Sequence, residues 1–170
     1  SPKLIEDNDG NSIVKVSDSW DKHAYVNKSK YQKKYKLSIK ENEKFWAKEG
    51  KRISWIKKYS KIKDEKYSKD EVKIKWYYDG TLNASANCID RHLKKNSSKT
   101  AIIWVGDDPA DSKKISYREL HQNVCKAANG LKNLGVQKGD RVTIYLTMIP
   151  ELAYVMLACA RIGAVHSIIF

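Results

Sequence analysis

The stretch 141–170, RVTIYLTMIPELAYVMLACARIGAVHSIIF, constrains the fold more than any other part of the chain. Pro150 suits the first turn of a helix, where a backbone N–H would have no intrahelical acceptor. Gly163 suits the left-handed residue that often follows the end of a helix. The apolar, β-branched runs 141–146 and 164–170 flank this helix. Two such strands joined by a helix predict a βαβ unit, with parallel strands and a right-handed crossover.

The preceding sequence predicts further elements of an α/β domain. Residues 100–105 (TAIIWV) form a predicted strand, and Ile115 lies in a short returning strand, which together make a hairpin. Ser116 and Glu119 have the spacing of a capping box, in which each side chain bonds the other residue's backbone N–H. An amphipathic helix follows and ends at Gly135. From residue 100 onward the expected order is β–β–α–β–α–β, a layered α/β domain with a parallel βαβ unit.

The N-terminal part is expected to be less regular. Residues 1–30 lack sustained periodicity and are expected to be a mobile tail. Residues 31–75 are dense in aromatic side chains, which predicts a helical, aromatic extension that packs on the main domain. Within it, Ser38 and Glu41 predict a second capping box at the start of a helix. The charged run 60–71 predicts a surface loop, and the alternating run after it predicts a short strand.

One row of reactive side chains invites a catalytic interpretation. Residues 83–94 are predicted to form a helix capped by its first asparagine. Cys88 and His92 lie four residues apart on it, so a nucleophilic Cys–His pair is conceivable. The alternative is structural: Asp90, Arg91 and His92 bond the helix to neighbouring backbone, and Cys88 fills the core. We favour the structural interpretation, because neighbours in this row point in different directions on a helix.

Motifs for metal and phosphate chemistry are missing. Asp107, Asp108 and Asp111 gather in a turn, but their spacing does not match a calcium loop and no bidentate glutamate follows. The sequence contains no dinucleotide-binding, Walker A, zincin or nucleophile-elbow motif. The turn 147–149, where a nucleotide fold would cradle phosphates, has no glycine. Residue patterns alone therefore predict the N-terminal part of a cytosolic α/β protein.

The formal net charge of +13 raises the possibility of nucleic-acid binding. The excess lies mainly in residues 1–75 and is nearly all lysine. Recognition of bases and phosphates favours arginine, whose guanidinium binds in a bidentate manner. A genome biased toward A and T would enrich lysine together with the abundant Ile, Asn and Tyr. We therefore expect no nucleic-acid partner.

The cysteines and the hydropathy pattern bear on the compartment. Cys88, Cys125 and Cys159 are widely spaced and form no CxxC pair. This favours reduced, buried thiols over a disulfide framework or a zinc site. No window approaches the ~18 apolar residues of a membrane span, and the first residues lack the apolar core of a secretory signal. The expected location is cytoplasmic, without a membrane partner.

Longer motifs resemble a known family. Residues 31–170 are similar to the AMP-forming acetyl-CoA synthetases, within the adenylate-forming acyl-CoA synthetase superfamily. The motifs that carry this resemblance are FWAKEGKRISWIKKYSKIK, KWYYDGTLNASANCIDRHL, KTAIIWVGDD, ISYRELHQNVCKAANGLKNLGVQKGDRVTIYL and MLACARIGAVHSIIF. One departure is Thr147, where the family pattern has proline; it puts the rigidity of that loop in doubt more than the family.

The resemblance implies an acetate–CoA ligase that uses Mg-ATP to form acetyl-adenylate and then acetyl-CoA, with AMP and pyrophosphate as products. It implies that 76–170 is the truncated first part of the AMP-binding domain, whose partner is the remainder of its own chain. The residues that bind acetate, ATP, Mg and CoA lie downstream in the family. No catalytic, cofactor-binding or metal residue is therefore assigned, and the fragment alone is expected to be inactive.

Two alternatives stay open. One is a ligase for a related short acyl group, propionate or acetoacetate, because such relatives share this front half. The other is a non-catalytic, stand-alone binding module that uses its basic N-terminal arm.

Overall fold

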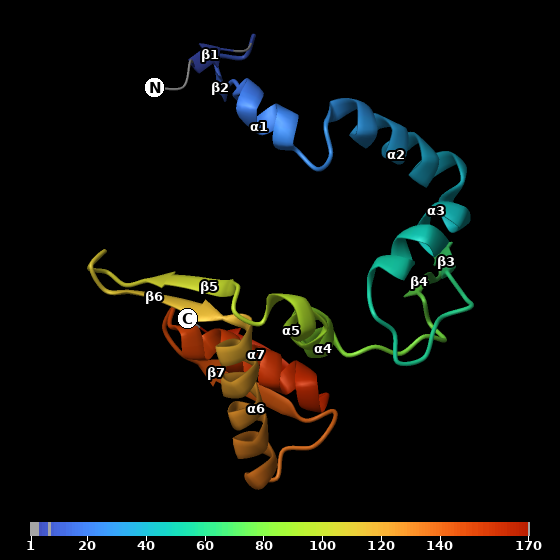
Figure 1. Ribbon diagram of the computed structural model, residues 1–170. Coiled ribbons are helices and arrows are strands. Elements are labelled where there is room, and N and C mark those ends of the chain that lie inside the picture. The colour runs from blue at the N-terminus through green and yellow to red at the C-terminus, as the bar shows by residue number, and fades with distance from the viewer. Residues whose placement is uncertain (1–3, 7, 170) are drawn as a thin grey trace. The chain divides into compact units, whose positions relative to one another are not determined.

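The computed structural model describes residues 4–6 and 8–169 of the chain. The chain divides into two compact units, Ser1–Gly50 and Lys51–Phe170 (Figure 1). In the first unit, β1 (Leu4–Glu6) pairs antiparallel with β2 (Ser12–Val14), and the helices are α1 (Asp18–His23), α2 (Lys28–Lys40) and α3 (Asn42–Glu49). The predicted tail therefore contains β1, β2 and α1, while its mobility stays a prediction.

Helix α2 begins earlier than the sequence suggested. The Asn27 side chain accepts a hydrogen bond from the Lys30 amide at 3.0 Å and caps the helix. Ser38 therefore lies inside the last turn, where its hydroxyl donates to the carbonyl of Tyr35 at 2.8 Å. Glu41 is the junction between α2 and α3. The capping box predicted from Ser38 and Glu41 is wrong, because a helix already occupies that segment.

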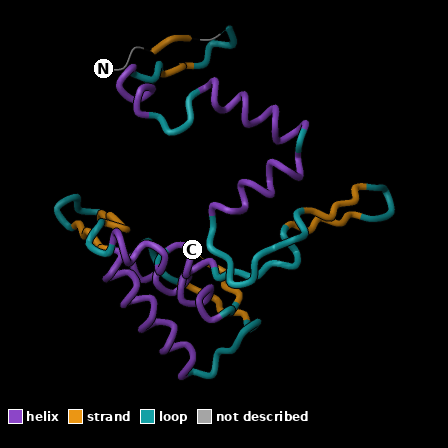
Figure 2. The backbone as a smooth tube through the Cα atoms, turned by 45° about the vertical axis from the view of Figure 1, so that its right-hand side comes forward, coloured by secondary structure: helices purple, strands orange, loops and turns teal. Residues whose placement is uncertain are grey.

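The second unit carries the elements of the expected α/β domain. A 3-10 turn at Gly50–Arg52 precedes a hairpin of β3 (Lys63–Tyr67) and β4 (Val72–Trp76). The further elements are α4 (Ala84–Cys88), α5 (Asp90–Asn96), β5 (Thr100–Val105), β6 (Ser112–Ser116), α6 (Tyr117–Asn133), β7 (Arg141–Tyr145), α7 (Pro150–Ile162) and β8 (Val165–Ile169). Among the described residues the strands pair two by two, as the separate orange strand pairs in Figure 2 show.

The βαβ unit is confirmed. Strands β7 and β8 are parallel, with Arg141 opposite Val165 and Tyr145 opposite Ile169. Pro150 is the first residue of α7. Gly163 has a φ of 80° and ends α7 in the left-handed conformation, as expected for glycine at this position. The local signals therefore fixed both ends of the helix and the start of the next strand.

Two predictions about local structure are wrong. The run 60–71 is not a loop throughout, because β3 lies within it and pairs with β4. One of its charges has an opposite partner across the hairpin, in the ion pair between Lys73 and Asp64 at 2.6 Å. The predicted helix 83–94 is broken at Ile89, which has φ −122° and ψ −66° and separates α4 from α5.

The core of the second unit forms where α6 and α7 pack against the end of α4. Ser116 and Glu119 form the predicted capping box at the start of α6, with the Glu119 carboxylate 2.8 Å from the Ser116 amide. One face of α6 is buried as its amphipathic pattern indicated. The buried cluster consists of Ile89, Ile115, Leu120, Val124, Ala128 and Ala158. Ile89 is fully buried in this cluster and is also the residue at which the chain passes from α4 to α5.

Aromatic side chains tie residues 51–80 together. The rings of Trp55 and Tyr59 lie 4.9 Å apart, and each contacts the ring of Tyr77, at 5.5 and 4.6 Å. Gly80 lies so close that an added Cβ would come within 2.7 Å of the Trp55 ring. Residues assigned by sequence to the extension thus pack against residue 77, while the predicted domain boundaries stay a prediction.

Candidate functional site

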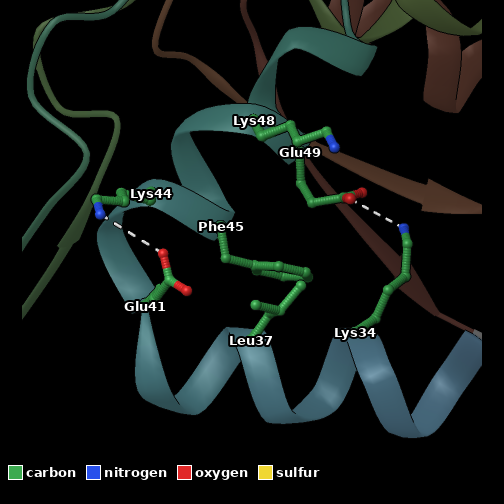
Figure 3. Close-up of a pocket in the computed structure, with 7 residues that line it drawn as sticks. All are labelled: Lys34, Leu37, Glu41, Lys44, Phe45, Lys48 and Glu49. Atoms are coloured by element: carbon green, nitrogen blue, oxygen red, sulfur yellow. Dashed lines mark hydrogen bonds and ion pairs between the residues drawn. The ribbon is translucent and has the colours of Figure 1, made fainter.

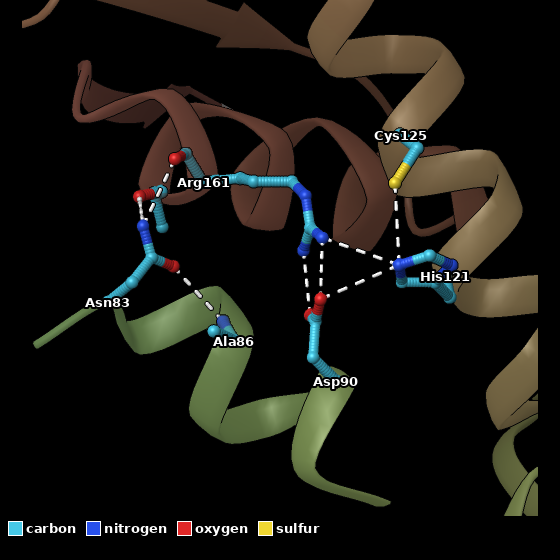
Figure 4. A network of polar contacts seen from close by, with 7 residues as sticks. Asn83, Ala86, Asp90, His121, Cys125 and Arg161 are labelled. Atoms are coloured by element: carbon cyan, nitrogen blue, oxygen red, sulfur yellow. Dashed lines mark hydrogen bonds and ion pairs between the residues drawn. The ribbon is translucent and has the colours of Figure 1, made fainter. Parts of the chain in front are cut away.

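A bidentate ion pair between Asp90 and Arg161 is the centre of a cluster of polar side chains (Figure 4). Arg161 donates from Nη1 to Asp90 Oδ2 at 2.7 Å and from Nη2 to Oδ1 at 2.6 Å. Asp90 is the first residue of α5 and Arg161 lies in the last turn of α7. An acid at a helix start and a base at a helix end both suit the helix dipoles. The pair therefore joins α5 to α7 in favourable positions.

His121 and Cys125 of α6 complete the cluster. His121 Nε2 lies 3.3 Å from Arg161 Nη2, 3.5 Å from Asp90 Oδ1 and 3.6 Å from Cys125 Sγ. A guanidinium can only donate, so in this contact Arg161 Nη2 is the donor and His121 Nε2 the acceptor. The side chains of Asp90, His121 and Arg161 are 34%, 30% and 23% exposed, so water reaches the cluster. We call these four residues the clamp.

Asn83 links the start of α4 to the end of α7. Its amide nitrogen donates to the carbonyls of Ala160 and Arg161, at 3.2 and 3.0 Å. Its amide oxygen accepts from the Ala86 amide at 3.0 Å and caps α4, as predicted. These carbonyls belong to the last turn of α7, where intrahelical partners are missing. One asparagine therefore serves two helix ends.

The electrostatics of the clamp follow from its contacts. The hydrogen bonds from Arg161 lower the pKa of the Asp90 carboxyl below its usual range, and the nearby positive charge acts in the same direction. Reciprocally, the hydrogen bonds to Asp90 raise the pKa of Arg161. Burial raises the pKa of the Cys159 thiol on the same helix. The clamp is thus a stable ion pair with a histidine and a thiol at its edge.

The catalytic candidates suggested by the sequence are not assembled. Cys88 is exposed at the end of α4, so the prediction that it fills the core is wrong. His92 lies beyond the break at Ile89, and its ring packs against Tyr117 with centroids 5.1 Å apart. Arg91 does bind neighbouring backbone, by donating to the carbonyl of Arg52 at 3.0 Å. The structural interpretation of this row holds for Arg91 and fails for Cys88.

The aspartates considered for calcium lie in the turn of the β5–β6 hairpin. Asp107, Asp108 and Asp111 are exposed, and the Asp108 carboxylate accepts from the Ala110 amide at 2.9 Å. Gly106 donates to the Asp111 carbonyl at 2.7 Å and closes the turn. Within residues 4–6 and 8–169, no three His, Cys, Asp or Glu side chains gather in a way that could hold a metal ion.

Sequence reasoning missed the clamp. His121 and Cys125 have the i, i+4 spacing that brings side chains together on a helix, so this contact could have been found. The ion pair between residues 90 and 161 joins positions 71 apart in the chain, and no local pattern indicates it.

Each of the two units has a hollow on its own surface among the described residues. In the first unit, Leu37 of α2 and Phe45 of α3 face each other, and ion pairs join Lys34 to Glu49 and Lys44 to Glu41 (Figure 3). This hollow is apolar at its floor and its charges are largely balanced. The second hollow lies at the carboxyl end of β7 and is lined by residues 145–148. The Trp104 indole donates to the Met148 carbonyl at 2.7 Å beside it.

The carboxyl ends of parallel strands are where α/β sheets bind ligands. Here the loop after β7 contains Thr147, Met148 and Ile149, with no glycine that would let backbone approach a phosphate. The described helices include none long and apolar enough to span a membrane. The clamp therefore positions helices, and the loop lies at a sheet edge. Among the described residues, none of the clamp, the hollows and this loop forms a catalytic constellation.

Comparison with known proteins identifies the family. Residues 31–88 match the family "Acetyl-coenzyme A synthetase N-terminus", and residues 89–170 match "AMP-binding enzyme". The boundary between them falls at Ile89, where α4 ends and α5 begins. The bonds of Asn83 to α7 and of Arg91 to Arg52 therefore join the two regions.

Curated relatives carry the name of the same family. An acetyl-coenzyme A synthetase of Parvibaculum lavamentivorans is 59% identical over 158 residues, covering 93% of this chain and 24% of the relative. An acetyl-coenzyme A synthetase of Methylocella silvestris is 55% identical over the same length, with the same coverage. The chain thus spans about a quarter of the length of the curated relatives it matches.

A solved structure supports the fold. The acetoacetyl-CoA synthetase from Streptomyces lividans superposes with a TM-score of 0.70 at 25% identity, over 86% of this chain and 22% of that one. The mixed α/β architecture is therefore the one found in acyl-CoA synthetases. From these matches, the chain belongs to the family of the acetyl-coenzyme A synthetases, whose N-terminal region it represents.

Proposed function

We propose that the chain is the N-terminal part of an acetate–CoA ligase. The complete reaction would join acetate to ATP as acetyl-adenylate with loss of pyrophosphate, and then transfer the acetyl group to CoA with release of AMP. The identity of 59% over 158 residues to an acetyl-coenzyme A synthetase carries this proposal. Acetate is favoured over acetoacetate because the match to the acetoacetyl-CoA synthetase is only 25% identical. Propionate stays a second candidate, since the resemblance implies that the acyl pocket lies downstream of these residues.

ATP, Mg and CoA are implied by this reaction, and the residues described do not fit them. The loop after β7 offers no glycine-rich cradle, and no group of acidic or histidine side chains could hold a metal among residues 4–6 and 8–169. No catalytic step is therefore assigned to these residues. Their contribution is structural. The clamp and the buried face of α6 hold α7, the helix that connects β7 to β8.

The partner of this region would be the remainder of a longer chain. Parallel sheets are normally covered on both faces. In β7 and β8 one face is covered, whereas Tyr145, Val165 and Ile169 on the other face are 77%, 55% and 50% exposed. We infer that downstream elements of a ligase cover this face, in the cytoplasm, where ATP and CoA are available.

A chimera tests the proposal. The aligned 158 residues of this chain would replace their counterpart in the Parvibaculum lavamentivorans acetyl-coenzyme A synthetase. We expect a folded chimera with acetate-dependent ATP–pyrophosphate exchange and formation of acetyl-CoA. A matched chimera carrying Leu120→Lys, which places a charge at a buried position of α6, should fail to fold. A folded chimera that is inactive with acetate but active with propionate would overturn the choice of acyl group.

The 170 residues alone should show no such exchange at any acetate concentration. Activity in the isolated chain would contradict the assignment of all ligand-binding residues to downstream regions.

A non-catalytic binding module is the second candidate, and one observation favours it. Helix α2, KSKYQKKYKLSIK, contains six lysines and no acidic residue, and none of its side chains is buried. If binding is the function, the chain should bind a polyanion such as heparin with an affinity that survives physiological salt. Binding that disappears near that salt concentration would reflect charge alone.

A further inference from the structure

A further hollow of the first unit adjoins the one in Figure 3, and Lys34, Leu37 and Lys48 line both. Its volume is about 630 Å³, within the ~300–1,000 Å³ that is typical of pockets for small molecules. The segment between α1 and α2 contributes to its lining, together with α2 and α3. The lining residues are Ala24, Tyr25, Val26, Lys30, Lys33, Lys34, Leu37 and Lys48. The hollow thus has the size of a ligand site and belongs to the first unit alone.

The charges in this hollow are all of one sign. Four lysines and, among the described residues, no acidic side chain line it. Lys34 bonds Glu49 at 2.9 Å, so its charge is partly balanced. Lys30, Lys33 and Lys48 are exposed, and within the described part of the chain no ion pair joins them to a carboxylate. Because gathered like charges repel one another, an anion that enters here relieves repulsion as well as gaining attraction. A compact, highly charged anion therefore fits this lining.

The rest of the lining is apolar or aromatic and open to solvent. Tyr25 is 85% exposed, and Val26 and Leu37 are 41% and 38% exposed. The ring contacts of the described residues do not include Tyr25, so its face is free to stack. Stacking on an aromatic side chain holds a nucleobase whatever its identity, because every base has a π face. An aromatic ring beside unbalanced lysines matches a ligand with a planar ring at one end and phosphates at the other.

We propose that this hollow binds nucleoside polyphosphates, with the phosphate chain on Lys30, Lys33 and Lys48 and the base against Tyr25. Lysine suits the role, because an ammonium group binds phosphate oxygens as a point charge. Mg²⁺ bound with a nucleotide takes its protein ligands from carboxylates, and no carboxylate lines the hollow in the described part of the chain. The lysines are therefore the counter-charges of the phosphates, and the Mg²⁺-free nucleotide is the form that binds. The site is independent of the ligase reaction proposed above, since it rests on the first unit alone.

Calorimetric titration of the whole 170-residue chain with GTP, at near-physiological salt and without Mg²⁺, tests the proposal. GTP is the probe because the proposed ligase uses ATP. Failure of GTP to bind and failure of acetate-dependent exchange in the chimera are therefore separate results. We expect the triple variant Lys30→Gln, Lys33→Gln, Lys48→Gln to bind GTP about tenfold more weakly or worse, because three exposed ion pairs are lost together. Absence of GTP binding in the parent chain would overturn the proposal.

Helix α2 offers a matched control for the effect of net charge. Lys28, Lys36 and Lys40 belong to the same helix but do not line the hollow. The variant Lys28→Gln, Lys36→Gln, Lys40→Gln removes the same charge, and glutamine keeps a helix propensity close to that of lysine. We expect its affinity for GTP to change far less than that of the first triple variant. Equal losses in the two variants would mean that GTP responds to overall charge, and would overturn the site.

Inorganic tripolyphosphate separates the phosphate chain from the base. Tyr25→Ala should weaken GTP binding by about fivefold or more, the low end of what stacking of a base contributes, and leave the affinity for tripolyphosphate unchanged. If GTP binds no more tightly than tripolyphosphate, or equally well to Tyr25→Ala, the hollow is a site for inorganic polyphosphate and the assignment to nucleotides is overturned. Excess Mg²⁺ should weaken GTP binding, because the ion competes with the lysines for the phosphates. Tighter binding with Mg²⁺ would refute the role of the lysines as counter-charges.

Discussion

Replacing Asp90 by asparagine and Arg161 by glutamine, singly and together, measures how strongly the clamp holds α5 to α7. The two bonds between these side chains, at 2.7 and 2.6 Å, have the parallel geometry that strengthens Arg–carboxylate pairs. Each substitution keeps the size of the side chain while removing its charge. The double-mutant cycle therefore isolates the interaction from the loss of either residue.

The expected magnitude follows from partial burial. Two unit charges about 4 Å apart attract by about 4 kcal/mol at an effective dielectric constant near 20. Loss of hydration opposes this attraction, because the two side chains are only 34% and 23% exposed. Fully exposed pairs contribute about 0.2–1 kcal/mol, whereas breaking a buried pair costs about 3–5 kcal/mol. We expect a coupling energy of about 1–2 kcal/mol between these limits.

Urea unfolding followed by circular dichroism gives the four free energies of the cycle. The matched control is the pair of Lys66 and Glu71, whose 2.7 Å contact is similar but whose side chains are 59% and 50% exposed. Its coupling should be clearly smaller than that of the clamp. Equal coupling in the two cycles would refute the argument from burial, and a coupling near zero at the clamp would refute its role in joining the helices.

Three further comparisons, made with five substitutions, test other parts of the structure by the same unfolding measurement. Gly163→Ala should lower the free energy of unfolding by about 1–2 kcal/mol, because Gly163 has a φ of 80°. Gly130→Ala, in open space within α6, should raise it by about 0.4–1 kcal/mol. A stabilising Gly163→Ala and a destabilising Gly130→Ala would contradict the assigned conformations. Hydrogen bonds from a serine hydroxyl and from backbone amides lower the pKa of Asp79 to about 2, so its contribution to stability is complete above the ordinary aspartate pKa and is lost as the pH falls from about 4 to 2. Asp79→Asn should therefore flatten the loss of stability over that pH range, and an unchanged pH profile would count against these bonds. Ile89→Ala should cost about 3–4 kcal/mol through lost burial and a cavity, while Ile103→Ala, at a side chain that is 67% exposed, should cost far less; comparable losses would contradict the placement of the core.

The resemblance to the acetyl-coenzyme A synthetases could be predicted from the sequence, because long motifs in a fixed order indicate a family without any knowledge of the contacts. Local structure was also predictable where a single residue dictates the backbone. Ser116 caps α6, Pro150 begins α7 and Gly163 ends it. Each of these signals acts on amides and carbonyls within about four residues, so the neighbouring sequence contains all the required information.

Local signals failed where a longer-range arrangement competed with them. The spacing of Ser38 and Glu41 predicts the start of a helix, but Ser38 lies within a helix that already starts at Lys28. The charged run around β3 forms a strand because it pairs with the backbone of β4, with one ion pair across the hairpin between Asp64 and Lys73. The helix break at Ile89 coincides with complete burial of its side chain against residues of α6 and α7. In each case the deciding partner lies outside the window that a sequence pattern covers.

The sequence by itself therefore determined the family, the ends of α6 and α7, and the parallel order of β7 and β8. Only the tertiary structure decided that Asp90 meets Arg161, that His121 and Cys125 join them, and that Cys88 is exposed. The physical reason is the range of the forces involved. Caps and turns are satisfied within one helical turn, whereas ion pairs and core packing depend on which distant residues the folded chain brings within contact.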